Sequence, residues 1–285
     1  MSKIVLVTGT SSGLGIALSV QAAQAGHTVY ATMRDLAKRR ALDEAAAAAG
    51  VALELLPLDV QEMESVTAAV DAVMAREGRV DVLINNAGAG YVRNIEQAEV
   101  ADFQWVMDVN FMGVVRCTKA VLPHMRAAGS GHVITISSVG GLVGQPFNEI
   151  YCGAKFAVEG FTESLASYVT PSFGVSFSVV EPGGIASDFA ANVMAHVGQT
   201  GGILDDAYKP LLERYVGGAQ ARQGTGDIYQ TADAVAAVVM EVMAAEEPPI
   251  RVRTSEWGER FTELKTMADP DGRKQQARVI EQFLG

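Results

Sequence analysis

Tyr151 and Lys155, together with Ser138, are the residues of this sequence whose types and spacing best fit proton-transfer chemistry. A spacing of four residues places Tyr151 and Lys155 on one face of a helix. An ammonium group there favours the phenolate, so we expect Lys155 to lower the pKa of Tyr151 toward a value useful in general acid–base catalysis. Such a pair is also common on exposed helix faces, and its interpretation depends on the elements that position it.

Apolar runs rich in β-branched residues recur along the chain, and each is followed by a longer stretch with helical periodicity. Most runs are apolar throughout, as expected for strands covered on both faces. This alternation predicts an α/β fold: a single-domain, doubly wound parallel sheet of the Rossmann type, with about seven strands and helices on both faces. The predicted strands are 4–7, 28–32, 53–58, 82–84, 133–136, 175–180 and 250–252.

A glycine-rich segment lies between the first predicted strand and helix-like sequence at 16–25. Glycines there permit a tight turn and let backbone N–H groups approach a pyrophosphate at the positive end of the helix. The spacing Gly-x-x-x-Gly-x-Gly differs from the commoner Gly-x-Gly-x-x-Gly, so the strand and helix around it carry the argument. We expect a dinucleotide to be bound by Gly9, Ser11, Ser12, Gly13, Leu14 and Gly15.

The end of the second predicted strand indicates which nicotinamide cofactor is used. An acidic side chain is usual there in NAD-binding folds, whereas a nearby arginine accommodates a 2′-phosphate. This strand ends in Met33 and Arg34, which removes the carboxylate and supplies a planar cation suited to phosphate. Asp35 lies too far along and is expected to cap the next helix. The sequence therefore predicts NADP(H) in preference to NAD(H).

These motifs, in this order, resemble the short-chain dehydrogenase/reductase family, and the resemblance extends from Lys3 to about Thr254. It implies a catalytic tetrad of Asn110, Ser138, Tyr151 and Lys155, with Asn110 holding a water that links the lysine to solvent. Tyr151 and Lys155 would also contact the cofactor. The resemblance assigns cofactor contacts to Asp59 and Val60 beside the adenine, to Asn86, Ala87 and Gly88 under the cofactor, and to Pro182, Gly183, Ile185 and Ser187 beside the nicotinamide.

Within that family, segments 30–35 and 138–165 resemble the oestradiol 17β-dehydrogenase and retinol dehydrogenase branch. The resemblance implies an oxidoreductase that transfers a hydride between NADP(H) and a secondary alcohol or ketone. Tyr151 would be the general acid or base, and the substrate a hydrophobic steroid-, retinoid- or aryl-ketone-like compound. It also implies a homodimer or homotetramer built on helices around 102–125 and 151–169. The resemblance fades in 187–226, the segment that would contact the substrate.

Charge and composition exclude several other classes of protein. The chain has 33 acidic and 22 basic residues, a formal net charge of −11, and so lacks the electrostatic footprint of a nucleic-acid-binding protein. Cys117 and Cys152 have no metal-ligand spacing and make no disulfide framework, so we expect no metal site and a reducing compartment. No apolar stretch is long enough to span a membrane, and we expect a cytoplasmic location.

The chain has no linker that would divide it, so we expect a single domain over residues 1–285. Glycines are frequent in 187–226, which we interpret as a mobile substrate lid, although a plain surface loop is an alternative. Residues 255–285 are expected to be a helical extension and contain no recognisable motif.

Three other functions are compatible with parts of the pattern. A reductase of 3-oxoacyl thioesters would use the same tetrad, but an acidic carrier protein would be a poor partner for a chain of this charge. A sugar-nucleotide epimerase also has a tyrosine and lysine four residues apart, with a different glycine spacing. A non-catalytic NADP(H)-binding redox sensor would have no need of Ser138, Tyr151 and Lys155 together.

Overall fold

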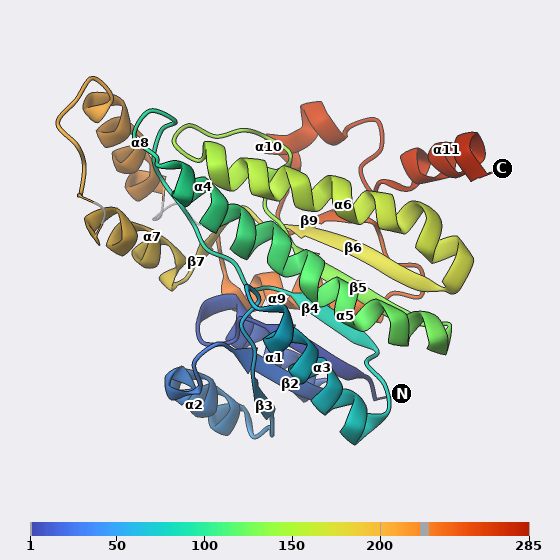
Figure 1. Cartoon of the computed structure of the whole chain (residues 1–285). Coiled ribbons are helices and arrows are strands. Elements are labelled where there is room, and N and C mark those ends of the chain that lie inside the picture. Colours follow the sequence, from blue (N-terminus) through green and yellow to red (C-terminus); the bar gives the residue numbers. More distant parts are fainter. Residues whose placement is uncertain (1, 200, 223–227, 285) are drawn as a thin grey trace.

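The apolar runs form the parallel sheet that the sequence predicts. The computed structural model describes residues 2–199, 201–222 and 228–284, and within them seven strands make one sheet in the order β3-β2-β1-β4-β5-β6-β9. Every adjacent pair is parallel, so the carboxyl ends of the strands share one edge (Figure 1). The strands are β1 (Ile4–Thr8), β2 (Thr28–Met33), β3 (Glu54–Pro57), β4 (Val82–Asn85), β5 (Gly131–Ile136), β6 (Val175–Glu181) and β9 (Arg251–Arg253).

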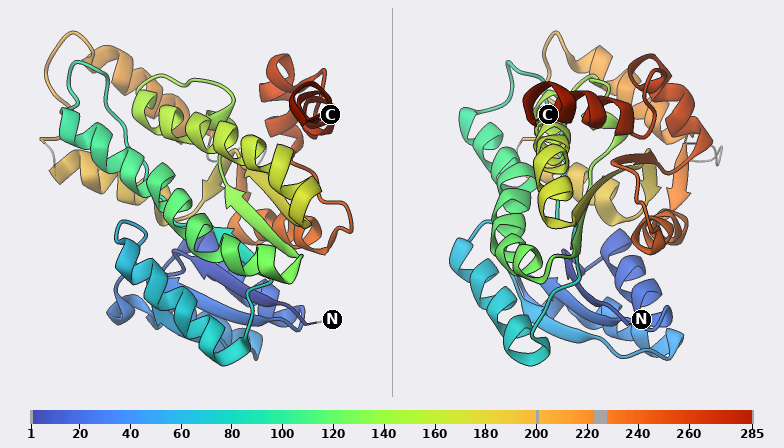
Figure 2. Two further views of the ribbon diagram at one scale, coloured as in Figure 1. Left: turned by 45° about the vertical axis from the view of Figure 1, so that its right-hand side comes forward. Right: turned by 90° about the vertical axis from the view of Figure 1, so that its right-hand side faces the viewer.

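One face of the sheet is covered by α3 (Met63–Glu77), α4 (Val100–Met107), α5 (Gly113–Ala128) and α6 (Glu149–Phe173). Alternate strand residues such as Leu6 and Leu83 pack there against Val70 of α3 and Val121 of α5. The other face is covered by α1 (Gly13–Gln24) and α9 (Ala232–Ala244), which enclose Val5 and Val7. Figure 2 shows the sheet edge-on between these two helical layers, as the sequence predicts. Helix α2 (Arg40–Ala49) packs Leu42 against Met33 at the end of β2.

The segment interpreted as a glycine-rich lid contains two helices, α7 (Asp188–Gln199) and α8 (Lys209–Arg222). Both lie beyond the carboxyl edge of the sheet (Figures 1 and 2). Residues 200 and 223–226 of the predicted lid lie outside the described residues. Two three-residue strands that the sequence analysis misses, β7 (Gly184–Ala186) and β8 (Tyr229–Thr231), pair in parallel at the two ends of this segment.

The tail forms α10 (Glu256–Thr266) and α11 (Arg273–Leu284). Helix α11 lies against α6, where the Gln276 side-chain amide donates a hydrogen bond of 2.6 Å to the Ala166 carbonyl oxygen. Across the described part of the chain, every helix is too short or too polar to cross a bilayer.

Candidate active site

The loop between β1 and α1 is held against the segment that follows β4. The Thr8 hydroxyl accepts hydrogen bonds of 3.0 Å from the backbone N–H groups of Asn86 and Ala87. In return, the Asn86 side-chain amide donates to the carbonyl oxygens of Thr8 and Gly9, each at 2.9 Å. Two segments that the sequence predicts to be cofactor-binding are thus joined by four hydrogen bonds.

Glycine is required in this loop because other atoms occupy the side-chain positions. Gly9 has a φ of 71°, and a Cβ there would lie 2.7 Å from the Ala87 Cα atom. A Cβ on Gly15 would lie 2.2 Å from the Gly9 carbonyl oxygen. Helix α1 begins at Gly13 with no side-chain cap and no acidic residue in its first turn. Its free N–H groups and dipole therefore make an anion-binding end.

At the end of β2, Met33 is buried and Arg34 is exposed, and both line the same cavity. The Asp35 carboxylate accepts a hydrogen bond of 2.9 Å from the Ala37 N–H group, which confirms its expected capping role. Lys38, a residue that the sequence analysis does not single out, adds a second cation to the cavity wall. The position that carries an acidic side chain in many NAD-binding folds is therefore apolar here, with two cations beside it.

A single cavity of about 1440 Å³ runs along the carboxyl edge of the sheet. A dinucleotide and a substrate together need more room than the few hundred Å³ of a small-ligand pocket. Every cofactor-binding and catalytic residue predicted from the sequence lines this cavity: Gly9, Ser11, Ser12, Gly13, Leu14, Gly15, Arg34, Asp59, Val60, Asn86, Ala87, Gly88, Asn110, Ser138, Tyr151, Lys155, Pro182, Gly183, Ile185 and Ser187.

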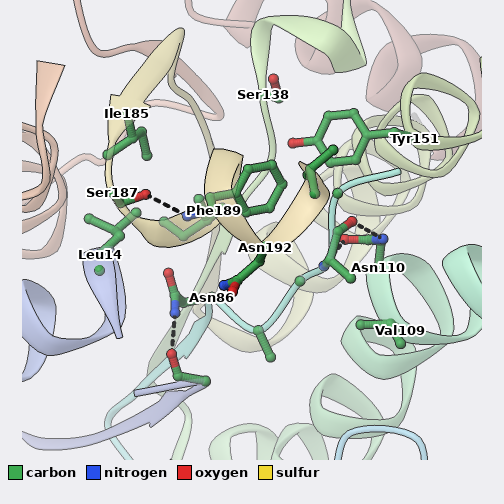
Figure 3. Close-up of a pocket in the computed structure, with 18 of the residues that line it drawn as sticks. Leu14, Asn86, Val109, Asn110, Ser138, Tyr151, Ile185, Ser187, Phe189 and Asn192 are labelled. Atoms are coloured by element: carbon green, nitrogen blue, oxygen red, sulfur yellow. Dashed lines mark hydrogen bonds between the residues drawn. The ribbon is translucent and has the colours of Figure 1, made fainter. Parts of the chain in front are cut away.

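Ser138 and Tyr151 meet in this cavity, although one follows β5 and the other begins α6. Figure 3 shows Ser138 beside the hydroxyl end of Tyr151, with Phe189 of α7 next to the tyrosine ring. Burial raises the pKa of Tyr151 to about 12, and a hydrogen bond to the Ser138 side chain opposes this rise. The direction is opposite to the sequence-based expectation, because the phenolate loses its hydration when the side chain is buried.

Lys155 is buried behind Tyr151, with its Nζ atom 5.7 Å from the centre of the tyrosine ring. Its ammonium group donates a hydrogen bond of 2.8 Å to the Ile136 carbonyl oxygen at the end of β5. Burial lowers the pKa of Lys155 to about 8. Lys155 is therefore held in the cavity wall, and its pKa lies close to neutral pH.

Asn110 lies in a π-helical turn, Asp108–Met112, that separates α4 from α5. Its side-chain amide donates to the carbonyl oxygens of Val106 at 3.0 Å and Ala89 at 2.9 Å, and its oxygen accepts from the Ala89 N–H group at 3.0 Å. A Cβ on Gly88 would lie 2.9 Å from that oxygen and 3.9 Å from Lys155 Nζ. Asn110 therefore repairs an interrupted helix beside the lysine, and such turns are frequent at functional sites.

The sequence of this chain is similar to those of known proteins. A family model described as short chain dehydrogenase matches residues 3–198 of the chain. The chain belongs to the short-chain dehydrogenase family. Retinol dehydrogenase 8 of Bos taurus is 39% identical over 276 residues, which cover 95% of this chain and 86% of the relative. The 17-beta-hydroxysteroid dehydrogenase type 1 of Homo sapiens is 41% identical over 278 residues, which cover 94% of this chain and 82% of the relative.

A solved structure of this dehydrogenase's fold is a variant of actinorhodin polyketide ketoreductase with NADPH. It has a TM-score of 0.76 and 28% sequence identity, and the match covers 89% of this chain and 96% of that structure. The parallel sheet and the family resemblance expected from the sequence are thereby confirmed.

The sequence analysis misses several residues that line the cavity near Tyr151 and the turn after β6. Phe189 lies with its ring centre 6.1 Å from that of Tyr151, and Asn192 and Val193 of the same helix also line the wall. Trp257 and Phe261 of the tail stack at 4.7 Å and line it as well. A Cβ on Gly183 would lie 3.0 Å from the Trp257 ring, so the tail reaches the turn after β6. No motif marks these residues. The one signal in the sequence was the spacing of Trp257 and Phe261, which places two aromatic side chains on one face of a helix.

The residues present in the dehydrogenase fit a nicotinamide dinucleotide. The side-chain positions of Gly9 and Gly15 are filled by neighbouring backbone, which leaves a smooth cradle at the start of α1. Backbone N–H groups without a cap there suit a pyrophosphate. From this cradle the cavity continues to Tyr151.

Proposed function

We propose that this short-chain dehydrogenase is an NADP(H)-dependent oxidoreductase that interconverts a secondary alcohol and a ketone. The observation that carries the proposal is the convergence of Ser138, Tyr151 and Lys155 on the cavity that begins at the glycine loop. A redox sensor that only binds a dinucleotide would need the loop and not this convergence. The relatives named as dehydrogenases of retinol and of hydroxysteroids act on alcohols, which supports the same reaction class.

The preference for NADP(H) rests on the end of β2. Arg34 lines the cavity with Lys38, and across the described residues no carboxylate is paired with Arg34. The extra phosphate of NADP(H) carries about two negative charges and accepts hydrogen bonds that a guanidinium group can make in pairs. The structural relative solved with NADPH is consistent with this assignment. Residues 9–15, Asp59, Val60 and the turn 182–187 would hold the remainder of the cofactor.

When bound, the cofactor supplies or accepts the hydride at the carbonyl carbon. In the reductive direction Tyr151 is the proton donor, since its raised pKa keeps the phenol protonated at neutral pH. Its hydroxyl hydrogen goes to the substrate oxygen as the carbonyl is reduced to the alcohol. Ser138 donates a hydrogen bond to that same oxygen and so stabilises the negative charge that develops there.

Lys155 and Asn110 support Tyr151 from behind. The Lys155 ammonium group stabilises the phenolate left after proton transfer, because the two groups are buried together where water screens little. Asn110 stabilises the π-helical turn beside Lys155. There it would hold the water through which the proton returns to Tyr151, as the family resemblance implies.

The substrate is a hydrophobic alcohol or ketone of the steroid, retinoid or aryl-ketone kind. The wall of the cavity that holds Tyr151 includes aromatic and aliphatic side chains of four elements that are far apart in sequence: Trp105, Val139, Phe189, Val193, Trp257 and Phe261. Helices α7 and α8, within the lid predicted at 187–226, would cover such a substrate. Apolar walls with few polar groups are typical of sites that bind compounds of this kind.

The test is a panel of steroid, retinoid, aryl-ketone and 3-oxoester substrates, assayed with NADPH and with NADH by the oxidation of the cofactor. We expect turnover of at least one hydrophobic ketone, with NADPH preferred. Turnover of the 3-oxoesters alone would favour a 3-oxoacyl-thioester reductase over the proposed substrate class. Cofactor binding without turnover of any compound would favour the redox sensor.

A further inference from the structure

Two glutamates that the sequence leaves unremarked are buried directly behind the catalytic residues. Glu159 of α6 is 5% exposed, and Glu181 at the end of β6 is 0% exposed. Arg253 of β9 is buried with them, and its Nη1 atom lies 3.3 Å from a Glu181 carboxylate oxygen. Buried carboxyl groups are rare unless they are paired, and of these two only Glu181 has an arginine partner in the ion pairs of the described residues.

These two carboxyl groups lack donors if both are ionised. Both side-chain oxygens of Glu159 and the second oxygen of Glu181 are buried without a hydrogen-bond partner when each is counted as an acceptor only. Arg253 donates to Glu181 and also to the Pro270 carbonyl oxygen at 2.7 Å. A proton on Glu159 would turn one of these acceptors into a donor and satisfy two of them at once.

The pair is adjacent to three of the segments that form the active site. Glu159 lies one helical turn after Lys155, on the same side of α6. Glu181 directly precedes the turn that starts at Pro182, and Ser137, whose hydroxyl approaches Glu159, directly precedes Ser138. A hydrogen bond between the two carboxyl groups would therefore also hold α6 against the ends of β5 and β6.

The fold leaves a fitted space for the Glu159 side chain. A Cβ on Gly141 would lie 2.8 Å from Glu159 Oε1 and 2.7 Å from the Ser137 hydroxyl oxygen. Gly141 has no positive φ and no turn requirement of its own. Its lack of a side chain is therefore explained by the carboxyl group that occupies the space.

Other charges bear on the pair from each neighbouring element. From α6, Lys155 and Glu163 act on Glu159, and from β9, Arg251 and Arg253 act on Glu181. Arg251 is itself paired with Glu163 at 3.2 Å and lies 3.8 Å from Asp269.

Arg253 is shared in the same way, since its Nε atom lies 3.0 Å from Glu259 of α10. Burial and the neighbouring Glu181 raise the pKa of Glu159 well above its ordinary value. Burial likewise raises the pKa of Glu181 to about 7, and Arg253 opposes that rise.

We propose that Glu159 is a positioning residue held as a neutral carboxylic acid, which donates a hydrogen bond to Glu181 and leaves the Lys155 ammonium group to face the cavity. An ionised Glu159, four residues after Lys155, would pair with the ammonium group and draw it from the Ile136 carbonyl oxygen that it now contacts. Neutrality of Glu159 thus keeps the lysine beside Tyr151. This inference rests on the proposed function for its effect on turnover, but the protonation state can be tested without turnover.

The first experiment compares Glu159→Gln with Glu159→Leu. Glutamine keeps a donor and the neutral charge, so kcat and the KM for NADPH should stay within about threefold of the unmodified enzyme, whereas leucine should lower kcat by about tenfold or more through the lost hydrogen bond. Glutamine should also flatten any loss of kcat that ionisation of Glu159 causes at alkaline pH. If Glu159→Gln is as impaired as Glu159→Leu, the residue acts as a carboxylate and the proposal is wrong.

The second experiment needs no substrate. Since the pKa values of both glutamates are raised in the folded protein, their stabilising contribution is complete below the ordinary pKa of 4.5 and is lost as pH rises through about 7 and above. The free energy of unfolding should therefore fall over this range, and fall less steeply in Glu159→Gln. Glu64→Gln, an exposed glutamate of α3 that does not act on the pair, should keep the slope of the unmodified chain.

Infrared difference spectroscopy completes the test. At pH 7 the carbonyl stretch of protonated carboxylic acids in the unmodified protein should lose intensity in Glu159→Gln and keep its intensity in Glu64→Gln. Absence of this loss, with equal pH slopes for all variants, would overturn the proposal even if the enzyme is active. If the loss is present in a chain that turns over no substrate, the proposed function fails and the protonation state stands.

Discussion

Burial shifts the two central ionisable side chains of the site in opposite directions. Tyr151 titrates at about 12 and Lys155 at about 8, so at neutral pH the phenol is neutral and the lysine charged. Reduction of a ketone needs both of these forms. We predict that kcat/KM for NADPH-dependent reduction is level below about pH 8 and falls above it, as Lys155 loses its proton. Unfolding midpoints at each pH serve as the control, and an enzyme that stays folded and keeps its full kcat/KM beyond pH 9 contradicts the assignment.

Arg34 provides a second test at the scale of single residues. Removing its guanidinium group by Arg34→Ala deletes a charge-assisted contact to the 2′-phosphate, so the Kd for NADPH should rise by about tenfold or more. The Kd for NADH should change little, because NADH has no phosphate there. Arg40→Ala removes a highly exposed arginine paired with Glu44 on α2 and should leave both constants unchanged. Equal weakening of both cofactors by Arg34→Ala would indicate a general structural effect.

At the scale of elements, the loop from β1 to α1 depends on close backbone approach more than on flexibility. Gly9 and Gly26 both have positive φ values, 71° and 85°, but only Gly9 has neighbouring atoms where a Cβ would be placed. Gly26→Ala should therefore lower the free energy of unfolding by about 1 kcal/mol, because only the strain of a left-handed backbone opposes the new side chain. Gly9→Ala should lower the free energy of unfolding further and abolish cofactor binding. Urea unfolding and fluorescence titration with NADPH measure the two effects, and equal behaviour of the two variants would contradict the role of Gly9.

The central strands β1, β2, β4, β5 and β6 were predictable because they are buried and most of their side chains are apolar. The helices that cover the sheet could also be predicted, from the helical spacing of their apolar residues. The strands β7 and β8 were missed since three residues such as Gly184–Ala186 carry no such pattern. Helices α7 and α8 were missed because glycines such as Gly198 and Gly217 are usual in loops, yet both have open space around them and fit in a helix.

That the glycine loop and the four residues of the proposed tetrad line one cavity could be expected from the sequence, because short motifs mark them. The aromatic residues of the cavity wall, such as Phe189 and Trp257, could not be predicted. They come from segments without motifs and reach the same cavity only when the chain folds. The pKa of Tyr151 was expected in the wrong direction because sequence spacing reports a neighbouring charge and not the depth of burial. For the same reason Glu159 resembles an ordinary surface residue of a helix in sequence.

At the scale of the whole molecule, we propose that α5 and α6 carry the contacts of a homodimer or homotetramer. Phe156, Tyr168 and Phe173 of α6 and Met112 before α5 are large apolar side chains left exposed. We predict that Phe156→Glu shifts the protein toward monomer in sedimentation velocity runs, because a charge would be buried in the contact. Leu264→Glu on α10, also at a highly exposed apolar residue, should leave assembly unchanged. A chain that is monomeric at every concentration contradicts the proposal.

The most direct test of the proposed proton transfer compares Tyr151→Phe with the unmodified enzyme. Two quantities are measured: the rate of single-turnover reduction of a ketone and the Kd for NADPH. The substitution removes only the phenolic oxygen, so NADPH should bind within about threefold of normal while the reduction rate falls by at least about a hundredfold, the contribution expected of a general acid. A Tyr151→Phe enzyme that binds NADPH and still reduces the ketone at a normal rate would show that Tyr151 does not donate the proton.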